Sequence, residues 1–247
     1  MNKAIVIIPT IGAHELELAV SSVLDQTVKT DVLVVFDGVQ YERDLKIPCD
    51  KRIHKLSLPF NTGSFRTAGI DKNLPRHWYG ARAMIAAAYA VNNDYSMILD
   101  QDNWLRSDHV ESCIEKLNAH SKNETAVVYS LRNIFRKDAT FVCRDDCESL
   151  GKQVGVSGYL IDTSCYFYRT DFLMQTAHWW LSGWGSDRVY LGRLMKNYGQ
   201  DSLAGTGLYT VNYRLGGNEG SVKEQFFLMG NQKNEERFKK PFPWSKE

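Results

Sequence analysis

The sequence lacks the signals that send a protein into or across a membrane. It has no positively charged start followed by a small-residue cleavage site, and no apolar run approaches the roughly eighteen residues that a membrane-spanning helix needs. We therefore expect a cytoplasmic protein without a transmembrane segment. Peripheral contact with a membrane surface stays open.

Cysteine is scarce and odd in number. The five cysteines argue against a disulfide framework and for reduced thiols. Cys143 and Cys147 stand four residues apart, but no second Cys/His pair follows at zinc-site spacing. Neither a disulfide scaffold nor a zinc module is indicated.

An excess of charge is also missing. Thirty basic and twenty-nine acidic residues give a net charge of +1, so no strong field attracts nucleic acid or an anionic membrane. The 247 residues, 43% of them hydrophobic, suit a single α/β core without internal repeats. We expect one domain over residues 1–225 and a C-terminal tail over residues 226–247 that packs on it or extends from it.

The N-terminal region has the pattern of a strand, a helix and a second strand. Residues 4–8 are apolar and mostly β-branched, residues 15–24 repeat their apolar positions at helical spacing, and residues 32–36 are again apolar and continuous. This order is typical of a parallel sheet. If the two strands are parallel, Asp37 is delivered to the carboxyl edge of the sheet.

Residues 97–99 are a short apolar run that ends on two carboxylates, Asp100 and Asp102. Such a run indicates a strand buried on both faces, and the period of two along a strand predicts that both carboxylates project to the same side. Open α/β sheets bind ligands at this edge. Hard carboxylate oxygens suit Mg²⁺ or Mn²⁺ in phosphate chemistry. The alternative is a solvated acidic turn before a helix that Ser107 caps.

The stretch between these regions carries turn and helix signals. Residues 52–58 predict a weaker third strand, and a long loop without periodicity follows up to His77. Residues 79–91 are rich in alanine and predict a helix with Arg82 in its first turn.

The second half of the chain has shorter strand patterns. We expect strands at residues 126–130, 141–143, 165–168 and 208–213. Arg132, Arg136 and Lys137 fall in the connection after the first of them. Residues 189–198 have helical spacing, which puts Asp187 at a helix start, where it complements the helix dipole. From Gly216 the composition predicts a loosely packed tail or one that a ligand orders.

Several motifs together resemble the GT-A fold glycosyltransferases, in particular those of family 2. The likeness covers residues 4–103 well and residues 164–215 more loosely. Its elements are the run of residues 5–10, residues 19–27, residues 32–38, Asn61-Thr62-Gly63, Gly80-Ala81-Arg82 and Asp100-Gln101-Asp102. The resemblance implies a Rossmann-like α/β fold with a mixed, mainly parallel sheet flanked by helices. It also implies an enzyme that transfers a sugar from a nucleotide-sugar donor, with a uridine nucleotide expected.

The resemblance implies a role for each matching residue on the donor side. Pro9 and Thr10 would line the nucleotide pocket, Asp37 would accept a hydrogen bond from the base, and Arg82 would approach the diphosphate. Asp100 would contact ribose or sugar hydroxyls. Asp102 would hold Mn²⁺ or Mg²⁺ together with diphosphate and water, since Leu215-Gly216-Gly217-Asn218 replaces the histidine that many relatives carry there.

The resemblance places the acceptor side around Trp184-Gly185-Ser186-Asp187, where Asp187 would be the catalytic base and Ser186 replaces the usual first acid. Trp184, Gly185 and His178 are candidates for the acceptor site. The cluster of Trp179, Trp180 and Trp184 either stacks on a sugar or only packs in the core. Arg82 likewise either binds the donor or pairs on its own helix.

These ingredients favour an inverting, metal-dependent glycosyltransferase with a glycan, lipid-linked or other hydroxyl acceptor. Two alternatives stay open. A sugar nucleotidyltransferase also presents acids and metal to a nucleotide, but residues 9–12 lack its glycine- and arginine-rich phosphate loop. A non-catalytic nucleotide- or sugar-binding protein would show donor affinity without turnover.

Overall fold

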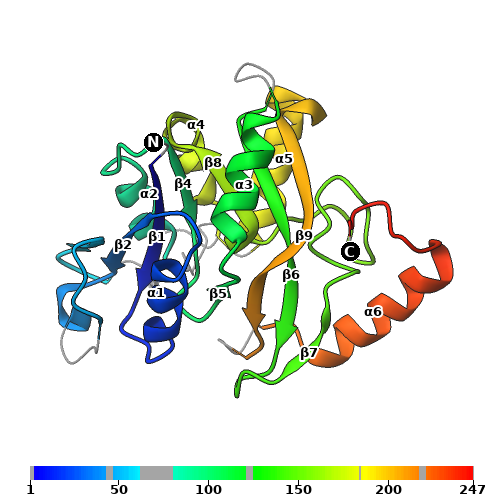
Figure 1. The fold of residues 1–247 in the computed structure, drawn as a ribbon, viewed down its shortest axis with the longest axis horizontal. Helices are drawn as coiled ribbons and strands as arrows, with labels where there is room; N and C mark the ends of the chain where they lie inside the picture. Colours follow the sequence, from blue (N-terminus) through cyan, green and yellow to red (C-terminus); the bar gives the residue numbers. More distant parts are fainter. Residues whose placement is uncertain are drawn as a thin grey trace, which may run out of the picture.

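The computed structural model describes residues 3–42, 47–61, 80–120, 125–183, 185–216 and 221–246. In these residues nine strands form one mixed sheet with the order β3-β2-β1-β4-β8-β6-β9-β5, and β7 pairs with β6 (Figure 1). The expected fold class, a mixed and mainly parallel sheet flanked by helices, is confirmed. Most of the predicted loop before His77 lies outside the described residues.

The predicted elements occur in the predicted order, and β5, α4 and α6 are additional elements that the sequence patterns do not predict. The strands are β1 (Ala4–Thr10), β2 (Thr30–Phe36), β3 (Ile53–Ser57), β4 (Tyr95–Ile98), β5 (Trp104–Leu105), β6 (Val127–Phe135), β7 (Phe141–Arg144), β8 (Tyr166–Arg169) and β9 (Leu203–Arg214). The helices are α1 (Leu16–Leu24), α2 (Ala81–Ala88), α3 (His109–Asn118), α4 (Thr170–Thr176), α5 (Ser186–Tyr198) and α6 (Glu224–Arg237). Short 3₁₀ turns include η2 (Thr163–Cys165) and η3 (Ala177–Trp180).

The N-terminal half of the sheet is parallel. Strand β1 pairs in parallel with both β2 and β4, so that Val6 lies beside Val32 and Met97. These three side chains are fully buried because helices cover both faces of the sheet. The carboxyl ends of β1, β2 and β4 therefore meet at one edge, and Asp37 is delivered there as predicted.

The second half of the sheet contains antiparallel pairs. Strand β8 runs antiparallel to β4 and β6, while β6 and β9 are parallel to each other. Both β6 and β9 are longer than predicted. Arg132 lies within β6 and is 2% exposed, so its expected place in a connection is wrong. Carboxylates that neutralise its charge keep it inside the strand.

Helices cover both faces of the sheet (Figure 1). On one side α1 and α3 lie next to each other, and Tyr95 Oη donates a hydrogen bond to Asn118 Oδ1 of α3 at 2.8 Å. On the other side the ring of Tyr166 meets Tyr190 of α5 at 5.3 Å. The N-cap of α3 is Asp108 and not Ser107 as predicted; the Ser107 carbonyl instead accepts from Thr27 N at 2.8 Å.

The C-terminal segment packs on the domain, which is one of the two arrangements expected for it, and it does so more closely than its composition predicts. Phe227 of α6 is fully buried, and Phe242 and Trp244 after the helix are 8% and 6% exposed. Trp244 Nε1 donates to Asp146 Oδ1 at 2.7 Å. The proposed boundary at residue 225 falls inside α6, which begins at Glu224.

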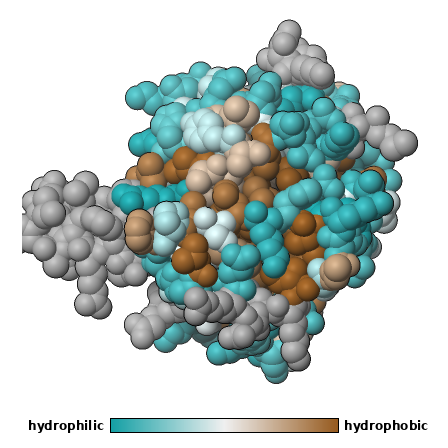
Figure 2. Space-filling model, turned by 90° about the vertical axis from the view of Figure 1, so that its left-hand side faces the viewer, coloured by the Kyte–Doolittle hydropathy of each residue, from teal (hydrophilic) through white to brown (hydrophobic). Residues whose placement is uncertain are grey.

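Viewed from the β2 and β3 end of the sheet, hydrophobic residues occupy the centre of the surface and hydrophilic residues surround them (Figure 2). Strand β3 ends the described part of the sheet at this side, and its Ile53 and Leu56 are only partly buried. Among the helices of the described ranges, none has the length and apolar character needed to cross a membrane.

Candidate functional site

The candidate site begins at the carboxyl ends of β1 and β2. Thr10 and Asp37 are 2% and 1% exposed, and Asp37 N donates to the Thr10 carbonyl at 2.9 Å. Pro9 is buried beside Thr10. Large apolar side chains remain exposed directly after each of β1, β2 and β3, namely Ile11 at 50%, Val39 at 51% and Phe60 at 75%. The structure thus brings Pro9, Thr10 and Asp37 together next to apolar surface.

Arg82 lies near this group. It is exposed in the first turn of α2, as predicted. Gly80, at φ +73°, precedes the helix, and a Cβ built on it would lie 3.5 Å from Pro9 Cβ. The start of α2 is therefore held against the end of β1.

Asp100 and Asp102 lie in the turn that follows β4, not on the strand itself. The strand ends at Ile98, and Asn103 N donates to the Asp100 carbonyl at 3.1 Å. Strand alternation therefore does not place the two carboxylates; the turn does. Asp100 Oδ2 accepts from Ser164 Oγ at 3.2 Å, whereas the Asp102 carbonyl accepts from Arg214 Nε at 3.1 Å.

Four carboxylates nevertheless share one electrostatic environment. Burial raises the pKa of Asp100 well above its usual value, and the charges of Asp162, Asp102 and Asp187 raise it further. Burial, aided by Glu15 and Asp162, raises the pKa of Asp102 to about 6. The charged groups that act on Asp100 and Asp102 are therefore mostly carboxylates.

Asp187 sits in the first turn of α5, as predicted. Gly185 precedes the helix at φ +75°, and Asp187 Oδ1 accepts from Arg188 N at 2.9 Å. Burial and the charge of Asp162 raise the pKa of Asp187, while the nearby guanidinium groups of Arg132 and Arg188 oppose that rise. The structure thus brings Asp187 into the electrostatic range of Asp100.

The other acceptor-side candidates are less connected. His178 is exposed on η3, and its ring lies 5.9 Å from Trp179. Trp180 is fully buried and stacks on Tyr190 at 4.2 Å, so it packs in the core. Trp184 lies outside the described residues. Apart from Asp187, the described structure therefore does not assign side chains to an acceptor site.

Several residues of the site carry no signal in the sequence. Gln101 Oε1 accepts from Thr10 Oγ1 at 2.7 Å and from Ile11 N at 3.1 Å. Ser164 and Asp162 come from η2 and the residue before it, and support Asp100 from across the sheet. Buried Arg132 contacts Asp162 in turn. Except for the local bond between Asp162 and Ser164, these contacts join segments far apart in the chain.

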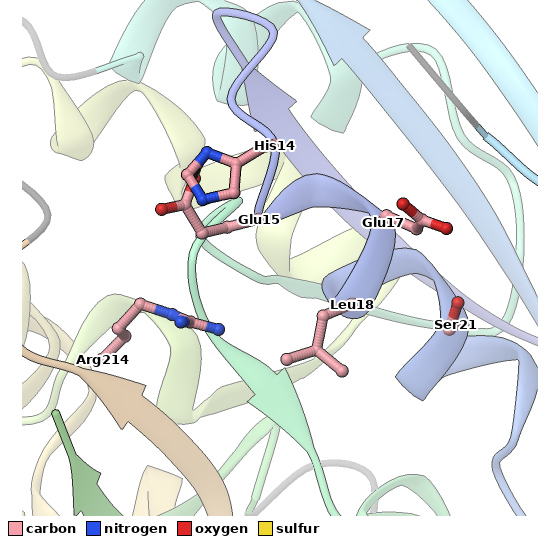
Figure 3. A pocket seen from close by; sticks show the side chains of 6 residues that line it. All are labelled: His14, Glu15, Glu17, Leu18, Ser21 and Arg214. Carbon is pink, nitrogen blue, oxygen red and sulfur yellow. Dashed lines mark ion pairs between the residues drawn. The ribbon is translucent and has the colours of Figure 1, made fainter. Parts of the chain in front are cut away.

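A hollow of about 370 Å³ lies beside Asp102. Its lining comes from the start of α1 and from β9, and consists of His14, Glu15, Glu17, Leu18, Ser21 and Arg214. Figure 3 shows Arg214 reaching from β9 into this space toward α1. Glu15 Oε2 lies 3.2 Å from His14 Nδ1. The hollow offers charges of both signs next to the acid turn.

The donor set near Asp102 fits a hard cation with few protein ligands. Across the described ranges, no group of three or more His, Cys, Asp or Glu side chains is arranged to hold a metal ion. The carboxylate oxygens of Asp102 fit Mg²⁺ or Mn²⁺ when phosphate oxygens and water complete the shell.

No protein-family model matches the chain, and neither does any curated protein sequence. Solved structures of S. aureus TarS are similar to it. TarS 1-349 aligns with a TM-score of 0.57 at 14% identity, covering 87% of this chain and 60% of that one. Its complex with UDP gives 0.57 at 13% identity, with coverages of 87% and 61%. Its complex with UDP-GlcNAc gives 0.53 at 14% identity, with coverages of 89% and 60%.

The chain therefore spans about 60% of the length of these TarS 1-349 structures. At such low identity the likeness establishes a shared fold and leaves chemistry to the residues of the site.

Proposed function

We propose that this chain is a glycosyltransferase that moves a sugar from a UDP-linked donor to a hydroxyl acceptor. The observation that carries the proposal is the position of Asp100 and Asp102 in the turn after β4, at the carboxyl edge of the parallel strands, with Asp187 of α5 near enough to raise the pKa of Asp100. Ligands bind at this edge in open α/β folds. The shared fold of TarS, which was solved with UDP and with UDP-GlcNAc, supports a nucleotide-sugar donor for this chain.

On the donor side, the nucleotide would lie over the ends of β1 and β2. Asp37 would accept from the base, and Pro9 and Thr10 would line the pocket. Exposed apolar surface from Val39 and Phe60 suits a flat base ring. Arg82, exposed at the start of α2, would meet the diphosphate.

Asp102 would hold a divalent cation, with Asp100 on the ribose or sugar hydroxyls. When bound, such a cation stabilises negative charge on the departing diphosphate. Burial is the main cause of the raised pKa of this carboxylate, and the charge of Arg214 opposes that rise. Arg214 holds the turn through the Asp102 carbonyl.

On the acceptor side, Asp187 would accept the proton of the attacking hydroxyl. A raised pKa suits this role because proton transfer is most efficient when the pKa of the base approaches the working pH. Direct attack opposite the leaving group inverts the anomeric configuration. Gly185, His178 and Trp184 are the proposed neighbours of an acceptor that is a glycan, a lipid-linked sugar or another hydroxyl compound.

Release of UDP from a panel of UDP-sugars, with Mn²⁺ and a mixture of sugar acceptors, tests the proposal. The native protein should release UDP, and both Asp102→Ala and Asp187→Asn should lose most of that activity. Asp201→Asn, at an exposed carboxylate away from the site, is the control and should keep it. UDP binding without any turnover would instead support the non-catalytic alternative.

A further inference from the structure

Arg132 is a buried cation that contacts three carboxylates at once. Its side chain is 3% exposed on β6. Arg132 Nε lies 2.8 Å from Asp145 Oδ2, Nη2 lies 2.5 Å from Glu148 Oε2, and Nη1 lies 2.5 Å from Asp162 Oδ2. All three guanidinium nitrogens are thus used, each on a different partner. Only a planar, forked cation can satisfy this arrangement.

One partner leads to the acid turn. While Asp162 Oδ2 accepts from Arg132, Asp162 Oδ1 accepts from Ser164 N at 3.0 Å. Ser164 Oγ then donates to Asp100 Oδ2 at 3.2 Å and accepts from Asp100 N at 3.1 Å. The orientation of the Asp100 carboxylate is therefore set by a hydrogen-bonded path that begins at Arg132.

A second partner leads to α5. Glu148 Oε2 pairs with Arg132, and Glu148 Oε1 lies 3.6 Å from Arg188 Nη2. Arg188 Nη1 also donates to the Ser157 carbonyl at 2.5 Å. Since Arg188 follows Asp187 and its backbone N donates to Asp187 Oδ1, these contacts fix the first turn of α5.

The third partner makes the arrangement rigid. Asp145 accepts from the backbone N atoms of Cys147, Glu148 and Ser149 at 3.1, 2.8 and 3.0 Å. It thereby shapes the turn that presents Glu148. The Arg132 guanidinium also lies 4.4 Å above the ring of Tyr213 on β9. The cation is held from both sides of the strand.

We infer that Arg132 is a positioning residue that holds both halves of the site, Asp100 through Asp162 and Ser164, and Asp187 through Glu148 and Arg188. This inference rests on the proposed function for the meaning of the two halves. It adds that the donor-side and the acceptor-side carboxylate are both positioned by the buried Arg132, each through its own set of contacts.

The two branches give different expectations for single substitutions. Ser164→Ala removes the hydroxyl on Asp100, so the Kd of UDP with Mn²⁺ should rise about tenfold, as for one lost hydrogen bond to a charged group. Glu148→Gln weakens the contact with Arg188, so the rate of UDP release from the donor should fall about tenfold while the Kd of UDP stays within about twofold.

Arg132→Lys should impair both the binding of UDP and the rate of its release from the donor. Arg136→Lys, at an exposed bridge to Glu224 beyond the same strand, should change neither.

The experiment combines calorimetric titration of UDP with Mn²⁺, UDP release from the active donor, and a crystal structure of Arg132→Lys. The structure is expected to show Asp162 displaced and its link through Ser164 to Asp100 broken, a readout that needs no substrate. An unchanged Asp162 and Asp100 in that structure would overturn the inference, even if the wild type fails to bind UDP. A wild type that binds UDP beside Ser164→Ala and Glu148→Gln variants indistinguishable from it would also overturn it. A wild type that does not bind UDP at all contradicts the proposed function instead.

Discussion

Gln101 Oε1 lies 2.7 Å from Thr10 Oγ1, so the middle residue of the acid turn is bonded to the end of β1. The same oxygen accepts from Ile11 N, and Thr10 Oγ1 accepts from Gly12 N at 2.9 Å. One amide therefore joins the proposed nucleotide pocket to the turn that carries Asp100 and Asp102.

Breaking this link should weaken both the fold and donor binding. Thr10→Val and Gln101→Leu each remove the hydrogen bond, and each should cost about 1 kcal/mol of unfolding free energy. Because the two residues act on each other, the double variant should cost less than the sum of the single ones. Urea unfolding of the four proteins measures the difference. Strict additivity would show that the bond contributes nothing.

The raised pKa of Asp102 predicts a pH-dependent gain in stability on Asp102→Asn. A carboxyl whose pKa is about 6 in the folded protein and 3.8 when unfolded binds its proton more tightly in the folded state. The unfolding free energy therefore falls as pH rises from about 4 to above 6. At pH 8 the variant should be more stable by up to about 3 kcal/mol, and at pH 4 the two proteins should differ little.

Urea unfolding in EDTA at the two pH values checks this prediction. Asp201→Asn, at an exposed carboxylate, is the matched control and should change stability equally at both. A gain from Asp102→Asn that is the same at pH 4 and pH 8 would mean that its ionisation is not the cause. Adding UDP together with Mn²⁺ at pH 8, in place of EDTA, should stabilise the wild type and leave the variant unaffected.

The proposed base predicts a separation of turnover from binding. Asp187→Asn should lower the rate of UDP release by about 10²- to 10⁴-fold, since general base catalysis contributes about that much, and should leave the Kd of UDP within about twofold. In the wild type, the rate should fall as pH drops through the raised pKa of Asp187, above the ordinary aspartate range. Steady-state rates of UDP release between pH 4.5 and 8 measure this fall. A rate that does not change with pH would contradict the role of Asp187 as the catalytic base.

The C-terminal segment predicts a large loss of stability from a single side chain. The ring of Trp244 stacks on Phe242 at 4.7 Å, and its Nε1 bonds to Asp146. Trp244→Ala should cost about 3–5 kcal/mol, and Trp244→Phe, which keeps the ring but loses the hydrogen bond, about 1–2 kcal/mol. Met229→Ala, at a half-exposed side chain of α6, should stay within about 0.5 kcal/mol. Guanidinium unfolding orders the three variants.

The sequence predicts those parts of the fold whose stability comes from neighbours along the chain. Residues 32–36 of β2 and 97–98 of β4 are apolar, α1 repeats its apolar positions at helical spacing, and α2 is rich in alanine, so the type of these elements follows from local sequence. The edge that receives Asp37 follows from the parallel pairing these units impose.

The remaining features depend on contacts between distant segments. Arg132 can lie within a strand only because three carboxylates from residues 145–162 surround it. The sequence near Arg132 does not predict these contacts. Asp100 is oriented by Ser164, sixty-four positions away. Helix α6 has a polar composition, and its place is set by the burial of Phe227 and by bonds to Asp146. Periodicity cannot reveal such interactions.

Thermal denaturation with UDP, in the presence and absence of Mn²⁺, tests the central claim most directly when the wild type is compared with Asp102→Ala. A ligand that binds the folded state raises the melting temperature. The account predicts a rise for the wild type that depends on Mn²⁺ and is lost in the variant. If neither UDP nor any other nucleoside diphosphate shifts the wild-type melting curve with either metal, this edge of the sheet does not bind a nucleotide-sugar donor.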